Sequence, residues 1–75
     1  MATVDLRGLS GGEPLQKTQQ ALSSLPSGSP VQVVGDDAEN ARIVKELLSE
    51  KGILYQEFKV DNQDWVLYFN VPDKL

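Results

Sequence analysis

The chemistry open to this chain is limited first by two residue types that it lacks. Its 75 residues include no cysteine and no histidine. Thiolate nucleophiles, imidazole bases, disulfides and the usual cysteine or histidine metal sites are therefore excluded. Aspartate, glutamate, lysine, tyrosine and serine remain, and their spacing marks no catalytic site. The sequence predicts no metal and no cofactor.

The most informative polar stretch is Ser10-Gly11-Gly12-Glu13-Pro14, which follows Arg7 closely. Ser10 and Glu13 have the spacing of a capping box, and Pro14 suits a first helical turn, where its missing amide needs no partner. This pattern predicts a helix capped by Ser10. Two glycines beside free amides, with Arg7 nearby, also suit phosphate, sulfate or carboxylate binding. The alternative is a loop that needs flexible residues only to turn.

The elements that must position this stretch follow from the apolar periodicity. Alternating segments predict strands, segments of helical spacing predict helices, and the length allows one domain, residues 1–75. The predicted strands are 3–7, 31–34, 53–60 and 65–71, and the predicted helices are 10–25 and 38–51. Asp36 or Asp37 caps the second helix, Gly52 ends it, and residues 61–64 form a hairpin turn.

This β-α-β-α-β-β order indicates an α+β fold. Right-handed β-α-β connections place both helices on one face of the sheet. We therefore expect a two-layer α/β sandwich in which two helices cover one face of a four-stranded mixed sheet, leaving the other face open.

The aromatic residues divide between the two expected faces. Trp65, Phe69 and Phe58 are expected to face the helices as part of the core. Tyr55 and Tyr68, together with Val66, are expected on the open face. Such an apolar patch would suit a homodimer or a protein partner.

Charge and hydropathy limit the partners. The net charge is -4, whereas nucleic-acid binding normally needs a basic patch. No apolar run approaches the ~20 residues of a membrane span, and the first residues lack the features of a signal peptide. We therefore expect a cytoplasmic protein with no membrane partner and disfavour nucleic acid.

The segment Asp5-Leu6-Arg7-Gly8-Leu9-Ser10-Gly11-Gly12-Glu13-Pro14-Leu15 resembles the opening of the TusA/SirA/YedF sulfur-carrier family. That family has an Asp, then Arg-Gly-Leu, then Cys-Pro-x-Pro at the start of its first helix. The stretches 17–22 and 33–52 are also similar, and the resemblance extends to about Val71.

The departure from this pattern determines what the resemblance implies. Gly11 stands where the family has its cysteine and Gly12 where it has the first proline, while Pro14 is retained. In the family, the cysteine accepts a persulfide sulfur from a donor enzyme and passes it on, chemistry that a helix N-terminus assists by favouring the thiolate. Glycine cannot form a persulfide.

The resemblance therefore implies a non-catalytic relative of the sulfur carriers, without sulfurtransferase activity of its own. It would be a protein-interaction or regulatory module related to sulfur transfer. The implied binding residues are Arg7, Ser10, Gly11, Gly12, Glu13 and Pro14. Two alternatives remain open. One is the anionic ligand at the first helix; the other is RNA binding, by analogy with the similarly folded C-terminal domain of bacterial translation initiation factor three.

Overall fold

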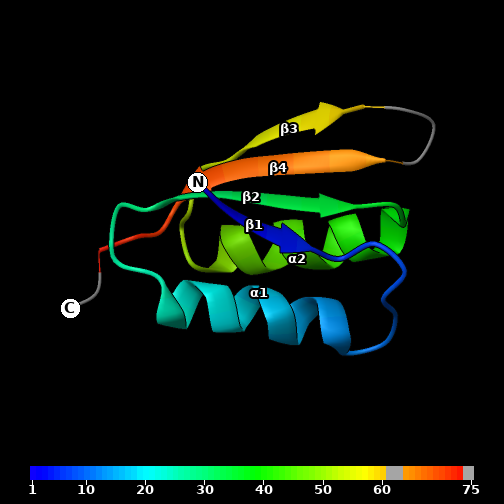
Figure 1. Cartoon of the computed structure of the whole chain (residues 1–75), viewed down its shortest axis with the longest axis horizontal. Coiled ribbons are helices and arrows are strands. Elements are labelled where there is room, and N and C mark those ends of the chain that lie inside the picture. Colours follow the sequence, from blue (N-terminus) through cyan, green and yellow to red (C-terminus); the bar gives the residue numbers. More distant parts are fainter. Residues whose placement is uncertain (61–63, 74–75) are drawn as a thin grey trace.

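The computed structural model describes residues 1–60 and 64–73. The elements, in chain order, are β1 (Ala2–Asp5), α1 (Glu13–Ser24), β2 (Pro30–Gly35), α2 (Ala38–Glu50), β3 (Gln56–Lys59) and β4 (Trp65–Asn70) (Figure 1). This order confirms the predicted β-α-β-α-β-β arrangement and the α+β class. The predicted hairpin turn lies largely outside the described residues, since 61–63 are not among them.

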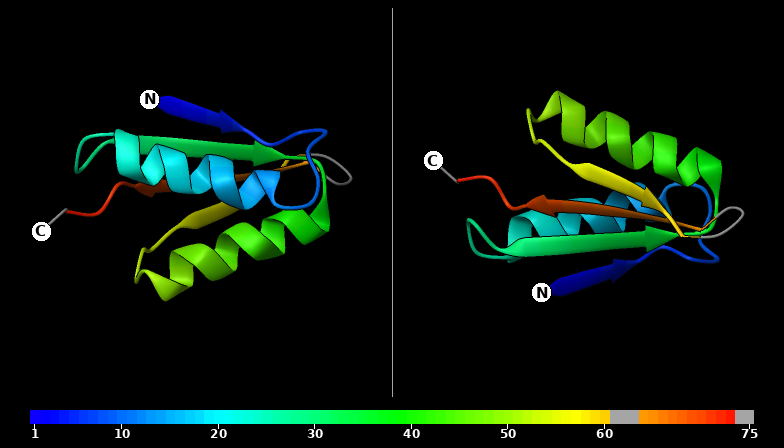
Figure 2. Two further views of the ribbon diagram at one scale, coloured as in Figure 1. Left: turned by 90° about the horizontal axis from the view of Figure 1, so that it is seen from below. Right: turned by 90° about the horizontal axis from the view of Figure 1, so that it is seen from above.

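The four strands form one mixed sheet in the order β1-β2-β4-β3. β1 runs parallel to β2, and β4 runs antiparallel to both β2 and β3. Both helices lie against the same side of this sheet, as the two views of Figure 2 show. The two-layer sandwich with one open sheet face is therefore confirmed.

The core lies between the sheet and the helices. Trp65, Leu67 and Phe69 alternate along β4 and are buried there, as the sequence predicts. They meet inward residues of β2 and the apolar stripe of α2. The buried apolar residues are Leu6, Leu22, Val31, Val33, Ala41, Val44, Leu47, Leu48, Ile53, Trp65, Leu67, Phe69 and Val71.

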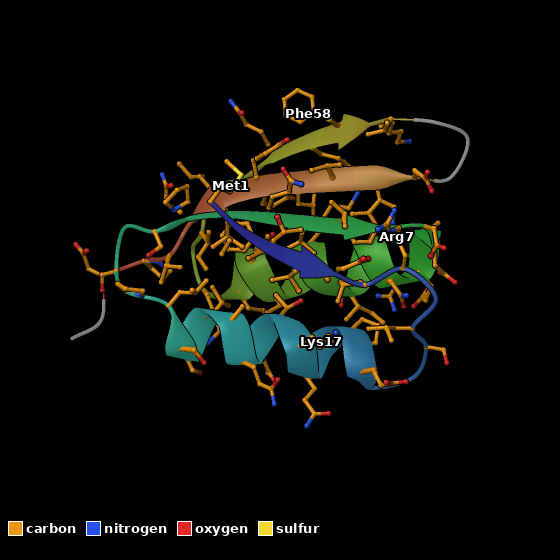
Figure 3. The ribbon with its side chains drawn as sticks, viewed as in Figure 1. Met1, Arg7, Lys17 and Phe58 are labelled. Atoms are coloured by element: carbon orange, nitrogen blue, oxygen red, sulfur yellow. The ribbon has the colours of Figure 1, made fainter. Side chains whose placement is uncertain are left out.

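The prediction that Phe58 faces the helices is wrong. Phe58 is paired with Val66 across the antiparallel β3–β4 ladder, and paired residues point to the same face of a sheet. Its ring meets that of Tyr68 edge-on, with 5.5 Å between the ring centroids. The side chain is 50% exposed and projects from β3 away from the helices (Figure 3).

The prediction that Tyr55 lies on the open face is also wrong. Tyr55 precedes β3, which is shorter than the predicted strand 53–60. The residue is partly buried and packs against the core cluster. Because Gln56 opposes Tyr68 on the open face, strand alternation directs Tyr55 towards the helices.

Neither helix of the described chain is long and apolar enough to cross a membrane.

Candidate functional site

The segment between β1 and α1 leaves the sheet through a fixed turn. Leu6 is fully buried, and its N–H donates to the carbonyl of Val34 at 2.8 Å. The Leu9 N–H then donates back to the Leu6 carbonyl at 3.2 Å. This turn brings the chain to Gly11, whose φ is +65°. That left-handed conformation is readily adopted only by glycine.

The helix start differs from the predicted capping box. α1 begins at Glu13, its N-cap is Gly12, and no side chain caps it. The Ser10 carbonyl, not its hydroxyl, accepts from the Glu13 N–H at 3.4 Å. The left-handed turn at Gly11 separates Ser10 from the cap position, so the prediction for Ser10 and Glu13 is wrong. Pro14 does occupy the first turn, where it is buried.

Asp36, just before the cap of α2, and Asn40, in the first turn of α2, hold this segment, which we call the entry loop (residues 6–12). The Gly8 N–H donates to Asp36 Oδ1 at 3.3 Å, and Asn40 Nδ2 donates to the Leu9 carbonyl at 3.0 Å. Asn40 is only 4% exposed. Two long-range hydrogen bonds therefore fix the entry loop against a second element of the fold.

The two adjacent aspartates have different roles. Asp37 is the cap of α2, since its carboxylate accepts from the Glu39 and Asn40 N–H groups at 2.8 and 3.3 Å. Asp36 serves the entry loop instead. From the sequence, either aspartate could be the cap. The role of Asn40 is not predicted, because the sequence shows only that it is a polar residue beside the apolar stripe of α2.

Arg7 is paired with an acid before any ligand arrives. Its Nε and Nη2 donate to the two Asp5 carboxylate oxygens at 3.0 and 2.9 Å, and its N–H also donates to Oδ1 at 3.0 Å. The Arg7 side-chain and backbone hydrogen bonds lower the pKa of Asp5 to about 2. Asp5, with smaller effects from Asp64 and Asp36, raises the pKa of Arg7.

The structure brings together most of the predicted binding residues. Ser10, Gly11, Gly12 and Glu13 are exposed side by side along the chain, and Arg7 is exposed where β1 gives way to the entry loop (Figure 3). Pro14 is buried beneath them. A Cβ placed at Gly11 or Gly12 would meet no atom within 4 Å. The site therefore has space for a side chain at Gly11 and Gly12, although neither glycine itself offers a reactive group.

The predicted interface residues are not all brought together. Val66 and Tyr68 lie on the open face beside Phe58, while Tyr55 packs on the other side of the sheet. A hollow of about 310 Å³ also lies on the open face beside Arg7. Its lining contains neither Gly11 nor Gly12.

Comparison with known proteins identifies a family and a similar solved structure. The family described as Sulfurtransferase TusA matches residues 2–71. The crystal structure of the SirA-like protein from Desulfitobacterium hafniense is similar, with a TM-score of 0.82 and 20% sequence identity over 97% of this chain and 100% of that chain. At that identity the structural likeness shows the fold alone. No curated protein matches the chain.

Proposed function

This chain belongs to the TusA family, and from that premise we propose that it is a binding member of the family that transfers no sulfur itself. One observation carries the proposal: the chain contains no cysteine at any position. The resemblance of residues 5–15 to the family's opening implies that Gly11 stands where the family has its cysteine. Persulfide transfer needs a sulfur nucleophile, because the transferred atom is held in a sulfur–sulfur bond. Without one, the family's frame can still dock to a protein.

The fixed entry loop supports a docking role. A sulfur carrier must present its loop to a donor and to an acceptor, so the loop surface is where a family partner would bind. Here hydrogen bonds from Gly8 and Asn40 hold that loop in one conformation. A preorganised loop loses little conformational entropy on binding. We infer that the partner is a persulfide donor or acceptor protein of a sulfur-transfer pathway.

Competition with a cysteine-bearing member of the family tests this proposal. The assay follows sulfur transfer from a persulfide donor enzyme to the cysteine-bearing relative, with increasing amounts of this chain. We expect the transfer rate to fall as the chain occupies the donor, while the chain itself gains no sulfur by mass spectrometry. An unchanged rate at large molar excess, or sulfur bound to this chain, would contradict the proposal.

A matched pair of charge reversals locates the docking surface. Glu13→Lys changes the exposed start of α1 beside the entry loop, whereas Glu50→Lys makes the same change at the end of α2. Reversing a charge at an interface alters association more than reversing one elsewhere. We expect Glu13→Lys to weaken the competition and Glu50→Lys to leave it unchanged.

The other hypotheses gain no specific support. The proposed anion site has its arginine paired with Asp5, its Gly8 amide bonded to Asp36, and Glu13 in the first turn of α1. RNA binding rests on likeness of fold, against a net charge of -4. A homodimer through Val66 and Tyr68 stays a prediction, with Phe58 in place of Tyr55 as the third member of the patch.

A further inference from the structure

β3 is an edge strand whose outer side pairs with no other described strand. In the sheet order β1-β2-β4-β3 its hydrogen-bonded neighbour is β4. All four residues, Gln56–Lys59, are exposed. An uncovered edge presents free backbone donors and acceptors, which makes it a template for another strand.

The ladder with β4 determines which backbone groups face outwards. The Val60 N–H donates to the Asp64 carbonyl at 3.1 Å, which continues the register that pairs Phe58 with Val66. Hydrogen-bonded and non-hydrogen-bonded pairs alternate in an antiparallel ladder. Phe58 therefore directs its N–H and C=O to β4, while Glu57 and Lys59 direct theirs away from the sheet.

We propose that two copies of this chain associate through antiparallel pairing of their β3 strands, joining the two sheets into one. Phe58 then lies on the twofold axis. Glu57 of each copy opposes Lys59 of the other, and these pairs carry the intermolecular backbone hydrogen bonds. The proposal does not depend on the proposed function, because no residue of the entry loop takes part.

Charge selects this register and this partner. Only every second residue of β3 directs its N–H and C=O outwards. The nearest alternative registers that keep the intermolecular hydrogen bonds are therefore shifted by two residues from the one centred on Phe58. They place Glu57 opposite Glu57, or Lys59 opposite Lys59, across the twofold axis. Like charges directly opposite destabilise a pair of strands, and opposite charges stabilise it. Of these three symmetric registers, the one centred on Phe58 is the one that places opposite charges against each other in an interface between identical copies.

The position of Phe58 adds an apolar contribution. It becomes a non-hydrogen-bonded pair with its own copy, the geometry in which opposing side chains lie closest. Phe58, a residue that is 50% exposed in the single chain and whose ring meets that of Tyr68, would lose exposed surface to its copy. Lysine on an edge usually discourages pairing, but here Glu57 of the second copy opposes it. A strand this short buries little area, so we expect a weak, concentration-dependent dimer.

Charge reversal with mixing tests the pairing. Lys59→Glu gives an edge with two glutamates, and Glu57→Lys gives an edge with two lysines. We expect the parent chain to sediment faster as its concentration rises, and each variant alone to remain monomeric. A mixture of the two variants should dimerise again, because every opposing pair then has opposite charges.

The mixture also separates assembly from folding. Glu57→Lys loses the ion pair of Glu57 with Lys45, which spans 3.1 Å, and mixing cannot restore that internal contact. Circular dichroism verifies that each variant folds. A parent chain that stays monomeric at the highest soluble concentration would overturn the proposal. So would a mixture that stays monomeric, or a dimer abolished by Tyr68→Glu but not by either charge reversal, since that result would place the contact on the open face.

A cysteine cross-link tests the register independently of charge. The chain has no cysteine, so Phe58→Cys introduces a single thiol on the predicted twofold axis. Opposed residues in a non-hydrogen-bonded pair have Cα atoms about 4.5 Å apart, within the range that a disulfide spans. We expect oxidation to link Phe58→Cys into dimers much faster than Gln56→Cys, which is off the axis. Equal rates for the two variants would refute this register.

Discussion

On the proposed alignment with the family's cysteine, Gly11 lacks the reactive side chain but not the space for one. A Cβ at this position would meet no atom within 4 Å, although the backbone has φ +65°. A residue with a Cβ is strained in that conformation by about 1 kcal/mol. We therefore expect Gly11→Cys to fold with a loss of about 1 kcal/mol in unfolding free energy. Its thiolate should attack the outer sulfur of a donor persulfide, so that the donor leaves as a thiol and the protein gains one sulfur atom by mass spectrometry.

Gly12→Cys is the matched control for that gain of function. Gly12 also has open space for a Cβ, and its φ of -85° is ordinary for any residue. The thiol there is one position away from the family's cysteine and faces no backbone strain. We expect it to fold at least as well as Gly11→Cys and to accept less sulfur from the donor enzyme. Equal sulfur uptake by the two variants would contradict the assignment of Gly11 to the cysteine position.

Asp5 provides a second test at the level of a single residue. Hydrogen bonds from Arg7 lower its pKa from 3.8 to about 2. A carboxyl group with a lowered pKa stabilises the fold at pH values above its ordinary pKa of 3.8. This stabilisation is lost as the pH falls through about 2. In Arg7→Gln the backbone N–H still donates to Asp5, so the pKa should rise only part of the way to its ordinary value. Carboxyl chemical shifts measured by NMR during an acid titration report this change.

The control for the Asp5 titration is Lys17→Gln. Lys17 also lowers the pKa of Asp5, but it has the smallest effect among the contributing groups. We expect this variant to leave the titration midpoint almost unchanged. A rise as large as that of Arg7→Gln would mean that net charge, not the hydrogen-bonded pair, sets the Asp5 pKa.

Between elements, Gly35 at the end of β2 packs closely against Trp65 at the start of β4. A Cβ on Gly35 would lie 2.2 Å from Trp65 Cζ2. The indole cannot easily move aside, because its Nε1–H donates to the Asp37 carbonyl at 2.9 Å. We expect Gly35→Ala to lower the free energy of unfolding by about 1–3 kcal/mol, as overpacking of a core does. Urea denaturation measures the loss.

Gly12→Ser is the comparison for Gly35→Ala. The open surroundings of Gly12 predict a change within about 0.5 kcal/mol. Equal losses in the two variants would show that general backbone flexibility, not the contact with Trp65, accounts for the effect at Gly35.

Sequence patterns predict well the elements whose apolar residues recur with a clear period. They fail to assign side chains to a face in a strand whose residues are all exposed. β4 alternates between buried and less buried residues, so its register on the core follows from the pattern. β3 has four exposed residues, and its pattern therefore cannot assign Phe58 to a face. Only the pairing of Phe58 with Val66 does so.

The entry loop shows a second limit on prediction at the scale of elements. The capping-box spacing of Ser10 and Glu13 predicts a helix capped by Ser10. The same spacing also occurs when Gly11 adopts a positive φ and the helix starts later. Only the backbone of Gly11 distinguishes the two cases. The hydrogen bond from Asn40 to Leu9 joins residues far apart in the sequence, and local pattern does not reveal it.

Across the whole molecule, protection of the backbone should be greatest at the middle of the sheet. β2 and β4 are the central strands and contain Val33 and Leu67, both fully buried. β1 and β3 form the edges. Local opening costs less free energy where few apolar groups are buried and the backbone is exposed. Hydrogen exchange followed by NMR should therefore find the slowest amides in β2 and β4.

Exchange within β3 then depends on the direction of each amide. The Phe58 N–H is directed to β4 and should be protected at every protein concentration, whereas those of Glu57 and Lys59 face outwards. In dilute solution these outward amides should exchange at rates close to those of an unfolded chain. At high concentration they should slow selectively, because pairing with a second copy engages them. Uniform slowing along β3 would instead indicate tighter binding of the whole strand to β4 and would argue against an intermolecular ladder.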